Sequence, residues 1–105
     1  MPLFLGILKE LNNIRFKLSS DEPLDPATVL IVTTDAASFS EEVPMTQIDP
    51  THFEGVWNTQ SRALGIATAV AQADDLSGNL GVITGEVDLI SSYGRRYGQD
   101  YGNGL

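Results

Sequence analysis

Two stretches in the second half of the chain alternate between two kinds of side chain. Between residues 62 and 73, every second position is small: Ala63, Gly65, Ala67, Ala69, Ala71 and Ala73. A period of two is typical of a β-strand, and small side chains on one face indicate that another layer approaches that face closely. The high helix propensity of alanine favours a helix instead. The period leads us to predict a strand.

The second alternating stretch covers residues 80–90, where Gly81, Ile83, Gly85, Val87 and Leu89 alternate with Val82, Thr84, Glu86 and Asp88. A short polar segment, residues 74–79, separates the two stretches. Two alternating runs joined by such a loop predict a β-hairpin, which we expect to be the scaffold of the domain.

The first half of the chain gives weaker signals. Residues 13–19 alternate and predict a half-buried strand, and the β-branched run at residues 28–34 predicts a strand buried on both faces. Residues 20–27 have the composition of a loop. Residues 35–58 contain Pro44 and Pro50, and we expect an irregular segment with a turn at Asp49–Pro50.

The N-terminal segment is apolar at positions 3, 4, 7, 8 and 11, which is helical spacing. We expect a short helix over residues 3–11, with Pro2 in its first turn and Asn12–Asn13 as its stop. Its apolar face packs either on the protein's own core or on a partner, because so short a helix is marginal alone. Phe4 and Leu5 are therefore candidate partner-binding residues.

The C-terminal residues combine glycines with aromatic and basic side chains: Tyr93, Gly94, Arg95, Arg96, Tyr97, Gly98, Tyr101, Gly102 and Gly104. Glycine at this density disfavours a helix, so we expect residues 92–105 to form an extended arm beside a single β-rich domain at residues 1–91. The arm is either a disordered end or a docking arm. In the second case the three tyrosines and two arginines contact a partner.

The fold class expected from these patterns is mainly β (a β-rich α+β domain), with a central hairpin, the N-terminal helix and the C-terminal arm. Trp57, the only tryptophan, is either a core anchor or a contact for a partner.

The net charge is −8, and no Lys or Arg occurs among the eight acids between Leu18 and Ser61. An acidic surface repels phosphate backbones, so we expect no nucleic-acid partner. The acidic surface is either a solvated face or a docking face for a basic protein. We expect no membrane association, because the apolar N-terminal segment is too short to span a bilayer. Cysteine is absent, which excludes disulfides and thiolate metal sites.

The residues that could perform chemistry do not form a recognisable constellation. His52 is the only histidine, and Asp49 and Thr51 next to it lie in a proline-containing loop. Asp75 begins a stretch with the spacing of a calcium loop, but Leu80 occupies the position that requires glycine. We therefore predict a non-enzymatic protein with no catalytic residue, no metal and no cofactor.

The hairpin region carries a resemblance to a known family. Eight residues resemble the core of lambda-type head decoration (capsid cement) proteins of tailed bacteriophages: Ala63, Gly65, Ile66, Ala69, Asp74, Gly85, Glu86 and Val87. The resemblance covers about a third of the chain. The chain departs from the family at both ends, because family members usually begin with a polar arm and have no such Tyr/Gly tail.

The resemblance implies a β-rich domain that sits on the capsid surface as trimers and clamps neighbouring coat subunits. The expected partner is the major capsid protein, and the expected location is the virion, after synthesis in the host cytoplasm. Two alternatives stay open: another phage structural protein of the tail or neck, and an acidic protein-binding module or inhibitor that docks on a basic partner.

Overall fold

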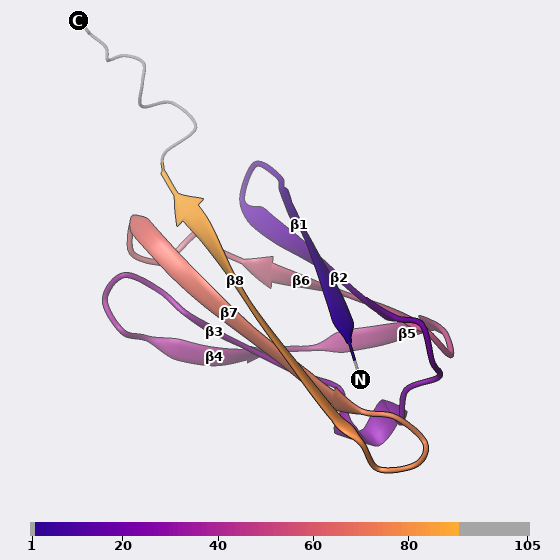
Figure 1. The fold of residues 1–105 in the computed structure, drawn as a ribbon. Helices are drawn as coiled ribbons and strands as arrows, with labels where there is room; N and C mark the ends of the chain where they lie inside the picture. Colours follow the sequence, from indigo (N-terminus) through magenta and orange to yellow (C-terminus); the bar gives the residue numbers. More distant parts are fainter. Residues whose placement is uncertain (1, 91–105) are drawn as a thin grey trace, which may run out of the picture.

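The computed structural model describes residues 2–90 as eight β-strands in two antiparallel sheets (Figure 1). This confirms the mainly β fold class. The strands are β1 (Leu3–Lys9), β2 (Asn13–Ser20), β3 (Leu30–Thr34), β4 (Ser40–Val43), β5 (Met45–Asp49), β6 (His52–Asn58), β7 (Gly65–Asp74) and β8 (Leu80–Leu89), and one 3-10 turn, η1 (Pro26–Thr28), precedes β3.

The chain is built from four consecutive hairpins that alternate between the two sheets. The first and third hairpins form the sheet β1-β2-β6-β5, and the second and fourth form the sheet β4-β3-β7-β8. This is the strand order of a constant-type immunoglobulin sandwich with one extra strand, β4, beside β3. The fold places the outer faces of the two sheets on opposite sides of the molecule, but it does not by itself specify a function.

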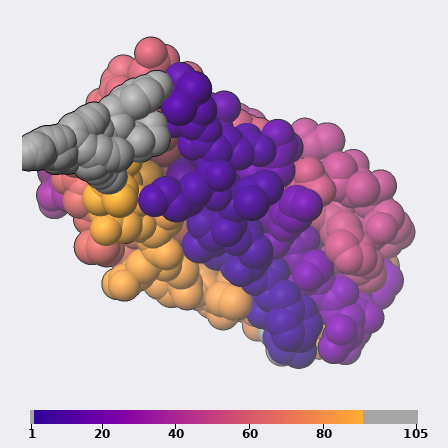
Figure 2. All heavy atoms as spheres, turned by 90° about the horizontal axis from the view of Figure 1, so that it is seen from above, coloured from indigo at the N-terminus to yellow at the C-terminus, as the bar shows by residue number. Residues whose placement is uncertain are grey.

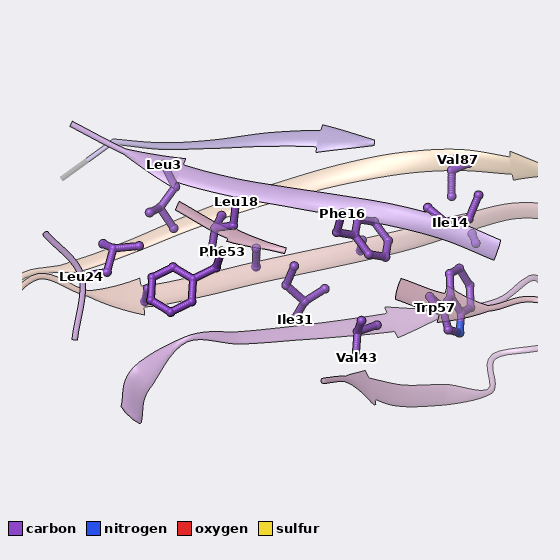
Figure 3. Packing of buried hydrophobic residues seen from close by; sticks show 14 of the residues in the cluster. Leu3, Ile14, Phe16, Leu18, Leu24, Ile31, Val43, Phe53, Trp57 and Val87 are labelled. Carbon is purple, nitrogen blue, oxygen red and sulfur yellow. The ribbon is translucent and has the colours of Figure 1, made fainter. Parts of the chain in front are cut away.

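The core lies between the two sheets and takes its largest side chains from β2 and β6 (Figure 3). Ile14, Phe16 and Leu18 alternate with polar residues along β2 and are fully buried, which confirms the predicted half-buried strand. The ring of Phe16 stacks on Trp57 of β6 with 6.4 Å between the ring centroids. Burial of such side chains supplies most of the stabilisation of a sandwich this small.

The alanines of β7 face the core and are completely buried: Ala67, Ala69, Ala71 and Ala73 are all 0% exposed. Their methyl groups leave room for the large side chains of the opposite sheet. β7 pairs with β8 continuously from Gly65–Leu89 to Asp74–Leu80. The predicted strand and the predicted hairpin are both confirmed here.

The predicted N-terminal helix is wrong, because residues 3–9 form strand β1. Leu5 and Ile7 point towards β8, where a methyl group at Gly85 would lie 2.9 Å from Ile7 Cδ1. Phe4 and Leu8 lie on the opposite, outer face. An edge strand that is apolar on both faces produces the same 3-4-7-8 spacing as a helix, so the spacing did not separate the two structures.

The expectation of an irregular segment at residues 35–58 is also wrong, because β4, β5 and β6 lie there. The two prolines sit between strands: Pro44 connects β4 to β5 across the sandwich, and Pro50 lies in the turn between β5 and β6, as predicted for Asp49–Pro50. Proline cannot donate to a sheet ladder, so it marks the ends of these strands rather than their absence.

The β3–β4 and β7–β8 hairpins close with the same five-residue turn, which begins at a buried aspartate. Asp35 Oδ1 accepts the N–H groups of Ala37 and Phe39 at 2.9 and 3.0 Å. Asp75 Oδ1 accepts the N–H groups of Ser77 and Asn79 at 2.9 and 2.8 Å.

The fourth residue of each turn has a left-handed backbone. Gly78 has φ 87° and Ser38 has φ 66°, and Ser38 is the only non-glycine residue with positive φ among residues 2–90. The structure therefore uses one turn geometry twice, with the favoured residue at one site and a disfavoured residue at the other.

Candidate docking surfaces

The outer face of β1 exposes two large apolar side chains. Phe4 is 51% exposed and Leu8 is 50% exposed. Leu5, the second residue expected to contact a partner, faces inwards and is partly buried against the core. We call the outer side chains of Phe4 and Leu8, together with the free edge of β1, the β1 surface. Figure 2 shows β1 and β8 side by side at this side of the molecule.

The backbone of β1 has an unpaired edge. In residues 2–90 its only ladder partner is β2. The Glu10 N–H donates to the Asn13 carbonyl at 2.8 Å where the β1–β2 hairpin closes. Hydrogen-bonded and non-bonded pairs alternate in an antiparallel ladder, so the N–H and C=O groups of Leu3, Leu5 and Ile7 point away from β2.

The sequence of β1 carries little protection against pairing with another chain, although β8 of the other sheet packs alongside this strand. No charged residue and no proline occurs from Leu3 to Leu8. Natural edge strands usually carry charges, prolines or bulges that prevent association with a further strand. The other long edge strand, β8, carries Glu86 and Asp88 on its outer face. An unprotected apolar edge is the feature that strand addition by a partner requires.

A second apolar surface lies on the outer face of β7 and β8, on the opposite side of the sandwich. Its exposed apolar side chains are Ile66, Val70, Leu80 and Val82, whose exposed fractions lie between 39% and 58%. Acidic side chains border it: Glu42, Asp74, Glu86 and Asp88. We call these residues, with the half-buried Leu30 and Val32 of β3, the β7–β8 surface.

The sequence contains a signal for the β7–β8 surface. Ile66 and Val70 occupy the alternate positions of the alanine stretch, so they must lie on the face opposite the alanines. Apolar side chains on both faces of a strand are typical of strands that are covered by a layer on each side. Within residues 2–90 no layer covers this outer face.

Trp57 is not part of either surface. Its side chain is 3% exposed, and its Nε1–H donates to Glu41 Oε2 at 2.6 Å. The same carboxylate lies 3.1 Å from Nε of Arg62, whose guanidinium group covers the Phe39 ring at 4.4 Å. The structure therefore places Trp57 as a core anchor, the first of the two roles considered for it.

The remaining predicted contact residues lie outside the described residues: Tyr93, Arg95, Arg96, Tyr97 and Tyr101. The same holds for the predicted arm as a whole, residues 92–105.

The His52 turn brings together the three residues named from the sequence. Asp49 Oδ1 lies 2.9 Å from His52 Nδ1 and accepts the Thr51 N–H at 2.9 Å. The hydrogen bond to His52 is the main reason why the pKa of Asp49 lies below its ordinary value. Thr51 lies in the two-residue turn between β5 and β6, and Asp49 and His52 flank it, so their contacts stabilise the turn.

The carboxylates of the two buried aspartates also accept hydrogen bonds from within the protein, from backbone N–H groups and from one side-chain amide. Asp35 Oδ2 accepts the Ala63 N–H at 3.1 Å, and this bond is the largest of the causes that lower the pKa of Asp35. Asp75 Oδ2 accepts the Asn79 side-chain amide at 2.9 Å, which is the largest cause of the lowered pKa of Asp75. The oxygens of these carboxylates accept hydrogen bonds from N–H groups. In a calcium site the same oxygens would face a cation.

Across residues 2–90 no three His, Cys, Asp or Glu side chains gather in a group that could hold a metal ion. The same part of the chain has no helix that is long and apolar enough to cross a membrane.

No family model matches the chain, and no curated protein matches it.

Proposed function

We propose that this protein is a non-enzymatic structural protein of a virion that decorates a phage capsid by bridging coat subunits. The observation that supports this proposal is the presence of two exposed apolar surfaces on opposite outer faces of one sandwich. A protein that bridges two subunits needs two separate contact surfaces held at a fixed distance. Two packed sheets about 10 Å apart supply this spacing. The resemblance to head decoration proteins supports the same function.

The β1 surface is the better defined of the two contacts. An extended segment of the major capsid protein would pair with the outward N–H and C=O groups of Leu5 and Ile7. Its side chains would contact Phe4 and Leu8, and burial of the exposed half of each would contribute about 1 kcal/mol. Main-chain hydrogen bonds give affinity in strand addition, and the side-chain contacts give specificity.

Co-sedimentation with coat-protein shells from the same source tests the proposal. Ile7→Pro removes one outward N–H group from the edge of β1 and leaves the β1–β2 ladder intact. Ile7→Ala removes the same packing against Gly85 but keeps the N–H group, so it is the matched control. We expect stoichiometric binding of the wild type and of Ile7→Ala, and strongly reduced binding of Ile7→Pro.

Thermal unfolding of both variants verifies that each is folded at the assay temperature. Wild-type protein that does not sediment with expanded shells would contradict the decoration role. Equal binding of Ile7→Pro and Ile7→Ala would contradict strand addition at β1. A Phe4→Ser variant then tests whether the outer side chains alone carry the contact.

The acidic border of the β7–β8 surface favours a second candidate function, an acidic module or inhibitor that docks on a basic protein. Binding of that kind weakens steeply as salt is raised, because exposed charges are screened within about 10 Å at 0.1 M ionic strength. A tail or neck protein of the same phage would use the same two surfaces. Co-sedimentation with tails in place of shells separates that role from decoration.

A further inference from the structure

The side chains of the β7–β8 surface form rows across three strands. Strand register places Val32 beside Val70 and Val70 beside Thr84. The next row contains Gln72, which lies between Leu30 and Val82. These two rows place the apolar side chains of Leu30, Val32, Val70 and Val82 near one another across β3, β7 and β8, with Gln72 and Thr84 among them, and we call this group the apolar band.

The acids lie at the margins of this band. Glu42 of β4 is beside Val32, Asp88 of β8 is beside Ile66, and Glu86 is beside Thr68. Within residues 2–90 none of these acids belongs to an ion pair. Among the described residues, no basic neighbour on this face offsets their negative charge.

The basic side chains of the described chain lie elsewhere. Lys9, Arg15 and Lys17 belong to β1 and β2, and Arg62 lies before β7. Arg15 contacts Glu10 at 3.2 Å and Glu54 at 3.7 Å, and Arg62 contacts Glu41 at 3.1 Å. The chain as a whole carries a charge of −8, so a second copy that presents the same face is repelled.

We infer that the β7–β8 surface binds a protein surface whose apolar centre is bordered by lysine or arginine side chains. The apolar band requires an apolar counterpart, and the acids at its margin select the opposite charge. Phosphate backbones and anionic lipid headgroups carry the wrong charge for this face. The inference rests on the proposed function, since this is the second of the two surfaces of the bridge, and it assigns the chemistry of that contact.

Fluorescence anisotropy with labelled peptides of about eight residues, the length of an ordinary strand, tests the inference on the full-length chain. The probes are an alternating Val–Lys peptide, an alternating Val–Glu peptide and an alternating Ser–Lys peptide. We expect the Val–Lys peptide to bind at least about tenfold more tightly than either of the others, a factor of ten being 1.4 kcal/mol. Its affinity should fall as salt is raised.

Two variants locate the binding site of the Val–Lys peptide. Glu86→Gln combined with Asp88→Asn removes two charges from the margin, and Asp21→Asn combined with Glu22→Gln removes two charges from an exposed loop elsewhere. We expect a several-fold loss of affinity in the first double variant and wild-type affinity in the second. Val70→Ser should abolish binding without unfolding the protein, since its side chain lies on the outer face.

Equal affinity of the Ser–Lys and Val–Lys peptides would overturn the inference, because charge alone would then explain binding. Equal loss in the two double variants would overturn it as well, because the contact would not be at this face. The peptide assay contains no coat protein, so its failure is distinguishable from failure of the decoration role. If shell binding depends on β1 alone, the decoration role is retained, but the β7–β8 surface does not bind a partner of this chemistry.

Discussion

The two matching turns give a reciprocal test of the fold, because one contains Gly78 and the other contains Ser38 at the left-handed position. An L-residue in this conformation costs about 1–2 kcal/mol, and glycine costs about 0.5–1 kcal/mol of extra chain entropy on folding. Ser38→Gly should therefore stabilise the protein by about 0.5–1 kcal/mol. For a domain of this size, 1 kcal/mol corresponds to about 4–8 °C, so the expected rise in Tm is about 2–8 °C.

The reverse change, Gly78→Ser, should have the opposite sign and a larger size. The φ of Gly78 is 87°, further than that of Ser38 from the left-handed minimum near +57°. A methyl group at Gly78 meets no atom within 4 Å, so backbone strain is the only cost. Strain near the upper end of the range of about 1–2 kcal/mol, less the roughly 0.5–1 kcal/mol of chain entropy that glycine costs, gives an expected destabilisation of about 1–1.5 kcal/mol.

Thermal and urea unfolding of both variants at pH 7 measure these changes. The urea slope should stay at its wild-type value, because neither change alters the surface exposed on unfolding. A lower Tm for Ser38→Gly, or an unchanged Tm for Gly78→Ser, would refute the reasoning. Either result would show that the turns are held by the Asp35 and Asp75 carboxylates irrespective of backbone preference.

Three further predictions concern the core and the loops. Gly55→Ala should cost about 3 kcal/mol in urea unfolding, because its methyl group would lie 2.5 Å from the Pro44 carbonyl oxygen; a loss under about 1 kcal/mol would contradict this close approach. Ala69→Leu should lower Tm through an overpacking cost of about 1–3 kcal/mol, whereas an unchanged Tm would mean that the alanine face is not closely packed. Asp35→Asn should lower Tm at pH 7, and the difference from wild type should shrink in unfolding measured below pH 4. The folded-state pKa of Asp35 is lowered, so its contribution is present above the ordinary pKa of about 3.9 and is lost as pH falls through the folded-state value. A difference that stays constant from pH 7 to pH 3 would contradict this assignment.

The parts of the fold that could be predicted from the sequence are those with a long, regular period. The β7–β8 hairpin is specified by two ten-residue strands with alternating side chains, and β2 by a shorter alternation. In contrast, β4 has four residues and β5 has five. The residues of β5 do not alternate between apolar and polar, so its sequence does not indicate a buried face. Short strands of this kind form because β3 and β6 offer partners, and a single sequence does not contain that information.

The docking residues could be predicted only in part, for a related reason. Phe4 was named from the sequence and lies at the surface, whereas Leu5 and Trp57 point inwards. The identity of an apolar residue does not decide which face of a strand is covered; the position of the second sheet does. Ile66 and Val70 were missed as contacts because the alanines between them gave the stronger pattern.

Single exposed apolar residues are ordinary on soluble proteins, so exposure of Phe4 or Val70 alone would say little. The arrangement carries more weight than the residues. On one side, the exposed side chains coincide with an unprotected strand edge; on the other, strand register joins them into a band with acids at its margin. The core between the two sides is complete without them, because the β7 alanines and the β2 side chains fill the space between the sheets. The outer side chains of both surfaces therefore lie outside the core cluster, and each surface is free to contact a partner.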